Sequence, residues 1–336
     1  MREIKLFRLF IFCVLVSFVS ENALSAFSLF KNKKRVLRSQ SKELLAAGFT
    51  RWSEWRKLCD LKGNLEKQNI TEQKLLLVIK YGGLRNIRTL NLSGNISLFS
   101  LPKEIKGLNK LRELYLSHTG VSEIFLLPKY LKVLDVSDTP VKRLPVLSKM
   151  LYLKEIYLGG TGIKEIDGHM LPKGLVTLDA SNCRSLTKVL HFGHLKNLKY
   201  IILRRTSVGD ISTLSLPVSL VIFDVGKSSV SNLPKALSRA INLKELDASK
   251  TKTVQLPSLK RLRKLKLLNL EGTKISSLNW TPFNKKLSCL NLLRTPLAKV
   301  LDYSLVKRAA DFSLTKEKGR KAVCELLMGL KNRGRY

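Results

Sequence analysis

The stretch LRELYLSHTGV at residues 111–121 recurs as LKVLDVSDTPV at 131–141, LKEIYLGGTGI at 153–163 and LKLLNLEGTKI at 265–275. These segments share the phrase L-x-x-L-x-L-x-x-T-x-[LIV], whose eleven places are called positions 1 to 11. Ten copies, called rungs one to ten, begin at Ile87, Leu111, Leu131, Leu153, Leu175, Leu198, Leu220, Leu243, Leu265 and Leu287. A period of 20 to 24 residues over so many copies indicates a repeat architecture.

The pattern within each rung predicts a short strand. Apolar residues at positions 4 and 6 alternate with polar residues at positions 3, 5 and 7, which is the period of a strand buried on one face. A repeat of about 22 residues leaves too little chain for a long returning helix, so we expect turns or 3₁₀ segments there. Because one rung cannot bury its own apolar face, neighbouring rungs must stack into a solenoid.

The phrase resembles the leucine-rich repeat family, over residues 87–298. The resemblance implies an α/β solenoid: a curved horseshoe of about ten repeats with a parallel sheet on its concave side. It also implies that position 9 turns inward, where its polar group bonds buried backbone at the bend. Threonine here replaces the asparagine more common in the family. Position 9 holds Asn95, Thr119, Thr139, Thr161, Cys183, Thr206, Ser228, Thr251, Thr273 and Thr295.

Residues 1–25 have the composition of a secretory signal peptide. A basic start is followed by the apolar run 9–19, and small residues, Ala23 and Ser25, precede the expected cleavage point. We therefore expect export to a bacterial periplasm or beyond, with an uncleaved membrane anchor as the alternative. Glycosylation patterns occur, but the register buries the one at Asn95, which argues against glycosylated export.

The two flanking segments are predicted to cap the solenoid, because its ends need a polar outer surface. Residues 26–86 form a basic cap region with helical character, in which Trp52 and Trp55 lie three residues apart. Residues 299–336 carry apolar residues between Leu305 and Leu330 at spacings that favour a second helical cap.

The chain is strongly basic, with 61 Lys and Arg against 25 Asp and Glu and a formal net charge of +36. The excess is patterned along the rungs. Position 5 is acidic at Asp135, Asp179, Asp224 and Asp247, between basic residues at positions 2 and 8. The basic residues are Arg88, Arg112, Lys132, Lys154, Lys199, Lys244 and Lys266 at position 2, and Arg205, Lys227, Lys250 and Arg294 at position 8. A solvated face would explain position 2, since lysine also protects sheet edges.

Large side chains at outward strand positions are the candidate binding residues. Tyrosine and arginine are enriched at binding hot spots. Packing between neighbouring rungs would explain the apolar members equally well. The candidate residues are Tyr115, Tyr157, Tyr200, Ile202, Arg204, Arg205, Lys227 and Lys250.

Catalytic signatures are missing from the sequence. It contains no nucleophile elbow, zinc-protease motif, phosphate-binding loop or dinucleotide fingerprint. His191 and His194 with Cys183 do not have the spacing of a zinc site, and five dispersed cysteines do not make a disulfide scaffold. We expect no enzyme, no metal and no small-molecule cofactor.

These observations favour an exported, non-enzymatic scaffold that recognises a protein partner on its concave face. The partner would be a host protein if the source is a host-associated bacterium. The alternative, which rests on the charge alone, is a binder of lipopolysaccharide, acidic lipid, glycosaminoglycan or nucleic acid. The two differ in salt dependence, because electrostatic binding weakens steeply with ionic strength. The oligomeric state is left open by the sequence.

Overall fold

A computed structural model describes residues 43, 46–49, 52–81, 84–277, 287 and 289–300. The rungs lie in one structural unit that begins at Trp55, and the chain up to Glu54 forms another. The predicted signal peptide lies outside the described residues, as does the predicted C-terminal cap beyond Val300. In the described part of the chain, no helix combines the length and the apolarity needed to cross a bilayer.

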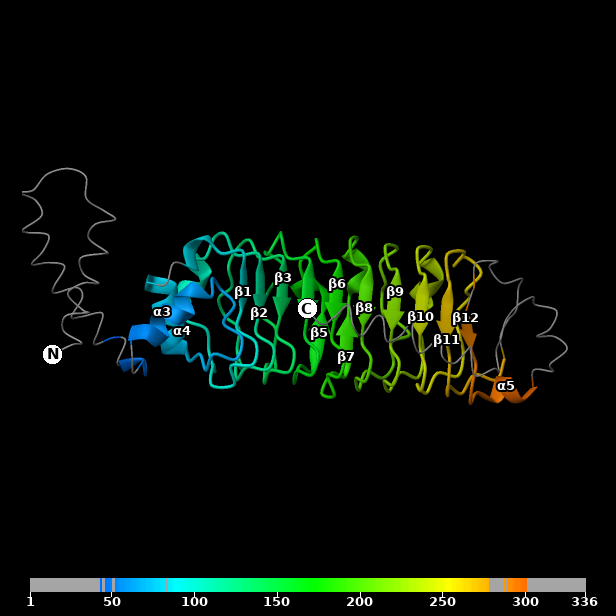
Figure 1. The fold of residues 1–336 in the computed structure, drawn as a ribbon. Helices are drawn as coiled ribbons and strands as arrows, with labels where there is room; N and C mark the ends of the chain where they lie inside the picture. The colour runs from blue at the N-terminus through cyan, green and yellow to red at the C-terminus, as the bar shows by residue number, and fades with distance from the viewer. Residues whose placement is uncertain are drawn as a thin grey trace, which may run out of the picture. The chain divides into compact units, whose positions relative to one another are not determined.

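The rungs form one ten-stranded parallel sheet, as the repeat pattern predicted (Figure 1). Neighbouring strands pair at the same phrase position, as Leu90 does with Leu114 and Leu114 with Leu134. The strands are β1 (Thr89–Asn91), β2 (Glu113–Tyr115), β3 (Val133–Asp135), β4 (Glu155–Tyr157), β6 (Thr177–Asp179), β8 (Tyr200–Ile202), β9 (Ile222–Asp224), β10 (Glu245–Asp247), β11 (Leu267–Asn269) and β12 (Cys289–Asn291).

The return paths contain short elements, which confirms the prediction of turns and 3₁₀ segments. Two further strands, β5 (Glu165–Asp167) and β7 (Lys188–Leu190), pair in parallel as a second sheet. Short helical elements lie before, between and after the strands. They are the 3₁₀ helices η1 (Leu84–Asn86), η2 (Lys103–Gly107), η3 (Gly168–Met170), η4 (Phe192–His194) and η5 (Lys235–Arg239), and the α-helix α5 (Pro296–Val300).

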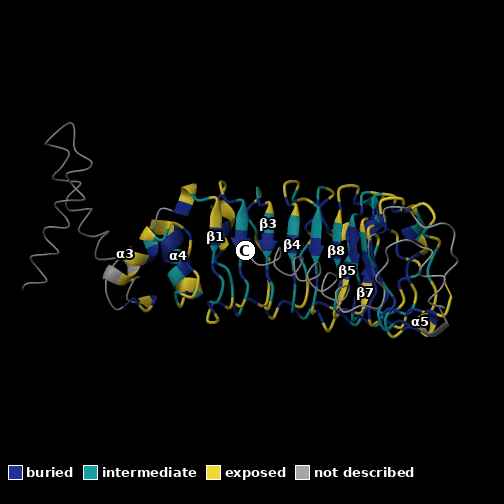
Figure 2. Cartoon of the chain, turned by 45° about the vertical axis from the view of Figure 1, so that its right-hand side comes forward, coloured by how far each residue is buried: buried dark blue, intermediate teal, exposed yellow. Residues whose placement is uncertain are grey.

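The core lies between the sheet and the returns. In rung two, the residues at positions 1, 4, 6 and 11 are fully buried: Leu111, Leu114, Leu116 and Val121. Figure 2 shows that exposed residues gather mostly in the turns, while buried and half-buried residues follow the strands. Burying one such side chain contributes about 1.5–3 kcal/mol, so repetition of the phrase builds the stability of the solenoid.

Main-chain hydrogen bonds continue from rung to rung past the end of the three-residue strands. The N–H at position 6 donates to the carbonyl at position 5 of the next rung, as from Leu116 to Asp135 at 2.8 Å. The N–H at position 8 donates in the same way to position 7, as from Lys227 to Ser249 at 2.6 Å. Neighbouring rungs are therefore held together well beyond the strands themselves.

The polar column at position 9 is buried and bonds the backbone, as the resemblance implied. Each Thr or Ser hydroxyl donates to the position 6 carbonyl of its own rung, at 2.5–2.8 Å. Cys183 differs, because its thiol donates to Leu158 O of the preceding rung at 3.0 Å. Asn95 is buried and its amide bonds Leu92 O and Leu65 O, so a glycan has no room there.

A non-helical segment lies beside the first strand. It falls between the helices α3 (Trp52–Asp60) and α4 (Glu72–Tyr81). Leu65 N donates to Asn91 O at 2.7 Å, and Asn91 N donates to Gly63 O at 2.8 Å. Helices thus occur where the sequence predicted them, but extended chain makes these bonds to β1. A helical cap remains a prediction at both ends.

The hydroxyl column makes a stability prediction. Thr206→Val keeps the shape of the side chain but removes the hydroxyl that donates to Leu203 O at 2.8 Å. Because that buried carbonyl loses its donor, we expect the free energy of unfolding to fall by about 1–3 kcal/mol. Urea unfolding measures the loss, and Thr206→Ser, which keeps a hydroxyl, should lose less. A valine variant as stable as the wild type would contradict this role.

Candidate functional site

The outward strand positions form an acidic surface in a basic protein. We call the side chains at positions 3, 5 and 7 the strand face. Across the ten rungs, positions 3 and 5 contain no Lys or Arg. Seven of these positions are acidic: Glu113, Asp135, Glu155, Asp179, Asp224, Glu245 and Asp247. Most of the basic residues of the phrase therefore lie beside the sheet, at positions 2 and 8, with Arg204 at position 7 as an exception.

Asp and Asn at position 5 terminate the strands. In seven rungs the side-chain oxygen accepts the N–H of position 7, at 2.7–3.2 Å, in an Asx turn. The aspartates predicted as an acidic stripe are thus structural. The residues concerned are Asn91, Asp135, Asp179, Asp224, Asp247, Asn269 and Asn291.

Two predicted tyrosines at position 5 already have acidic partners. The hydroxyl of Tyr115 donates to Glu113 at 3.4 Å, and that of Tyr157 donates to Glu155 at 2.7 Å. Burial and the neighbouring glutamate raise the pKa of Tyr115 to about 12, and the same causes raise the pKa of Tyr157. Both rings are half-buried and remain protonated donors at neutral pH.

Tyr200 and Ile202 lie together on β8, as the sequence predicted. Both are half-buried and point from the same side of the strand. Tyr200 pairs in register with Ile222 on β9, and Ile202 pairs with Asp224. These side chains form an apolar area on the otherwise acidic strand face. Ile222, which the sequence did not single out, is the buried neighbour of Tyr200 on the adjacent strand.

Arg204 is already occupied by two aspartates of the following rungs. Its guanidinium lies 2.9 Å from Asp247 Oδ2 and 3.6 Å from Asp224 Oδ2, and its side chain is 23% exposed. A Cβ on Gly226 would lie 2.7 Å from this guanidinium, so glycine leaves the room for it. Arg204 therefore holds three rungs together, whereas the sequence had grouped it with the binding residues.

The aspartate pair beneath Arg204 has an unusual proton affinity. Burial, and then the nearby Asp247 carboxylate, raise the pKa of Asp224 to about 7, although Arg204 opposes the rise. The unfolded carboxyl titrates near pH 4, so the folded state binds the extra proton between these values. Acidification from pH 8 therefore stabilises this part of the fold.

The remaining basic candidates share a backbone conformation that their side chains disfavour. Arg205, Lys227 and Lys250 at position 8 have φ of 55–58°, in the left-handed region. Arg294 continues the series at 58°. We call these four residues the basic column. Earlier rungs fill the same position with residues that tolerate this region, such as Gly94, His118, Asp138, Gly160 and Asn182.

The left-handed backbone of the basic column is imposed by the fold and not by the side chains. The position 8 N–H donates to the next rung at Arg205, Lys227 and Lys250, as from Arg205 to Gly226 O at 2.9 Å. A long side chain there costs about 1–2 kcal/mol compared with the right-handed region. Lys250 lies 3.6 Å from Glu271, while Arg205 and Arg294 are exposed. Lys and Arg therefore recur, in rungs six, seven, eight and ten, at a position where Gly or Asn would suit the backbone better.

Other potential site residues were missed by the sequence reasoning. Ile96, Phe99, Phe125 and Leu151 are 73, 68, 77 and 72% exposed, in the turns of rungs one to three. These residues lie outside the eleven-residue phrase or at its variable position 10, where the repeat does not call for an apolar side chain. That departure was visible in the sequence. Cys183 is buried and bonded to Leu158 O, so it does not join His191 and His194.

No family model matches the chain. The disease resistance protein RPP4 of Arabidopsis thaliana is 28% identical over 214 residues, which cover 56% of this chain. The match spans 17% of that relative's own length.

Solved structures share the architecture. The leucine-rich repeat domain of APL1B is 19% identical, with a TM-score of 0.55, covering 65% of this chain and 64% of that one. The leucine-rich effector YopM of Yersinia pestis is 21% identical, with a TM-score of 0.51, covering 73% and 69%. A chain of the Drosophila Toll–Spatzle complex is 22% identical, with a TM-score of 0.52, covering 65% and 33%. At these identities the likeness establishes the leucine-rich repeat fold.

Arg205→Asn tests the strain in the basic column. Asparagine tolerates positive φ, so we expect the free energy of unfolding to rise by about 0.5–1 kcal/mol. Urea unfolding gives the value, and Lys199→Asn, at a position of negative φ in the same rung, should give no gain. Loss of stability in Arg205→Asn would argue against a strained backbone.

Arg204→Met tests the aspartate bridge. Removing the cation leaves two buried carboxylates together, so we expect a loss of about 3 kcal/mol at pH 8. The loss should be smaller at pH 5, because the carboxyl of Asp224 then takes up a proton. Urea unfolding at both pH values measures this, with Arg205→Met as the matched control at an arginine without an ion pair to these aspartates. Equal losses at pH 8 and pH 5 would refute the coupling.

Proposed function

We propose that this protein is a non-enzymatic scaffold that binds a protein partner, with the strand face and the basic column as its contact surface. The observation that carries the proposal is the basic column. Long cationic side chains occupy four left-handed positions, between rungs six and ten, that the backbone would fill better with Gly or Asn. Although the left-handed conformation is unfavourable for these residues, it places their charges in order along one side of the sheet, where a ligand could contact them.

The neighbouring apolar area gives the surface a second component. Tyr200 and Ile202 are half-buried in rung six, the rung in which the basic column begins at Arg205. An anchor fixed by a rigid sheet loses little conformational freedom on binding. The matching partner would place an aromatic or aliphatic group on Tyr200 and Ile202, and acidic groups along the basic column.

Similar folds support a protein as the partner. The chain that shares the fold with a TM-score of 0.52 comes from a complex of two proteins, Toll and Spatzle. Export by residues 1–25, or anchoring through an uncleaved signal, would place the partner outside the cytoplasm. A host protein is the expected partner if the source is a host-associated bacterium.

A polyanion is the second candidate, favoured by the net charge of +36 and by the basic column. The ligand would be lipopolysaccharide, acidic lipid, glycosaminoglycan or nucleic acid. The strand face opposes it, because the acidic side chains outside the Arg204 bridge, such as Glu113, Asp135 and Glu155, would repel an extended anion. Such a ligand would have to follow the edges of the sheet.

The two candidates are separated by a pair of charge-matched variants. The column variant carries Arg205→Asn, Lys227→Asn and Lys250→Asn, and it removes charge while suiting the backbone. The control variant carries Lys132→Gln, Lys199→Gln and Lys244→Gln at position 2. Both lose three positive charges. Capture of proteins from host-cell lysate and retention on heparin are measured at about 0.15 and 0.5 M salt.

For a specific protein site, we expect one captured protein to survive high salt with the wild type and the control. The column variant should lose it about tenfold. If both variants lose the captured protein to the same extent and both elute from heparin at equally lowered salt, the ligand is a polyanion and not a protein partner. If the wild type and both variants retain the captured protein equally at high salt, the basic column is not part of the binding site.

A further inference from the structure

Three of the chain's four histidines gather beside the second sheet. His169 and His191 are 22 residues apart, in the return paths of rungs four and five, one residue short of the register that pairs Asp167 with Leu190. His169 lies in η3 after β5, and His191 lies between β7 and η4. Stacking of the rungs therefore brings the two imidazoles together, with ring centroids 4.4 Å apart.

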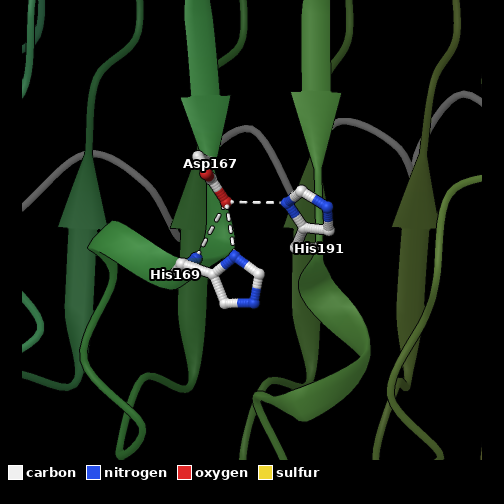
Figure 3. A group of neighbouring side chains, drawn as sticks. All are labelled: Asp167, His169 and His191. Atoms are coloured by element: carbon white, nitrogen blue, oxygen red, sulfur yellow. Dashed lines mark hydrogen bonds and ion pairs between the residues drawn. The ribbon is translucent and has the colours of Figure 1, made fainter.

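Asp167 at the end of β5 joins the two histidines (Figure 3). Its Oδ1 lies 3.0 Å from Nδ1 of His191 and 3.4 Å from Nδ1 of His169. The ligand atoms of the three residues all lie within 4.8 Å of one another. The figure shows both rings directed at the same carboxylate oxygen from neighbouring rungs.

The surrounding chain fixes this arrangement. Asp167 Oδ1 accepts the backbone N–H of His169 at 3.0 Å, which orients the carboxylate at the start of η3. Gly168 lies so close to the His191 carbonyl that a Cβ would collide with it. Phe192 is fully buried and anchors the chain directly after His191. The ring of His194 stacks on that of His169, with centroids 5.0 Å apart.

The donor set and its spacing match a transition metal. Zinc bonds nitrogen and oxygen ligands at about 2.0–2.2 Å. Tetrahedral ligands at such bond lengths lie about 3.3–3.5 Å from one another. The two measured nitrogen–oxygen separations, 3.0 and 3.4 Å, are close to this value. Two imidazoles with one carboxylate favour zinc and its neighbours over Mg²⁺ or Ca²⁺, which prefer oxygen ligands alone.

We propose that Asp167, His169 and His191 form a binding site for a divalent transition metal, with Zn²⁺ as the best-fitting ion. Three protein ligands leave a position for water or for a group from a bound partner. The site is independent of the strand face, so it stands or falls separately from the protein-binding proposal.

The test uses the full chain without a histidine tag and titrates it with ZnCl₂ by calorimetry. We expect one site with a dissociation constant in about the micromolar range. His169→Gln and His191→Gln should each weaken it about tenfold or more. His118→Gln is the matched control, because His118 in rung two forms an ion pair with a single carboxylate, Asp138 at 3.5 Å in rung three. This variant should bind as the wild type does.

A second measurement keeps folding separate from ligation. Co²⁺ bound by nitrogen and oxygen in a tetrahedral site gives strong visible absorption, so the wild type and His118→Gln should develop this band. His169→Gln should lack the band while keeping the circular dichroism of the wild type, since its side chain is exposed. The proposal would be wrong if zinc binding did not saturate, or if the wild type and the three variants bound zinc equally. Asp167, His169 and His191 would then be a hydrogen-bonded cluster without a metal.

Discussion

Parallel hydrogen bonds between equivalent positions of successive rungs constrain everything else in this protein. Because Leu90 pairs with Leu114 and Leu114 with Leu134, each phrase position becomes a column with one environment. That environment selects hydroxyls at position 9, Asp or Asn at most position 5 sites, and a left-handed backbone at position 8. A residue that departs from its column is therefore informative: Arg205 for its charge, and Cys183 for a thiol that bonds the preceding rung.

The periodic part of the structure was predictable, and the departures from it were not. Alternation of apolar residues predicted the strands and the core, and the family resemblance implied the buried side chain of Asn95, because each depends on one rung and its neighbours. The sequence missed the bridge from Arg204 to Asp247, since this contact spans two rungs and needs the space at Gly226. It also missed the pairing of His169 with His191, although their spacing of one period was visible. Left-handed backbone at Lys227 could have been suspected from Gly, Asn and Asp in the same column.

The charge of the protein is arranged so that opposite signs occupy adjacent columns. Acidic side chains at positions 3 and 5 lie between basic ones at positions 2 and 8, so net charge describes the surface poorly. Within a Debye length of about 8–10 Å, a ligand would meet both signs at once. A uniform polyanion fits such a surface less well than a folded partner with its own mixed charges. This pattern, more than the total of +36, is what the proposed function depends on.

The extended segment beside β1 affects how the protein behaves at high concentration. A parallel sheet with an open first strand would offer unpaired backbone groups to another copy of the chain, and such edges template aggregation. Here Leu65 and Lys67 donate to Asn91 O and Ser93 O, while Gly63 O accepts from Asn91 N. The amide of Asn95 fastens the same segment through Leu65 O and the Ile70 N–H. Truncation to the rungs alone would uncover this edge and favour end-to-end polymerisation.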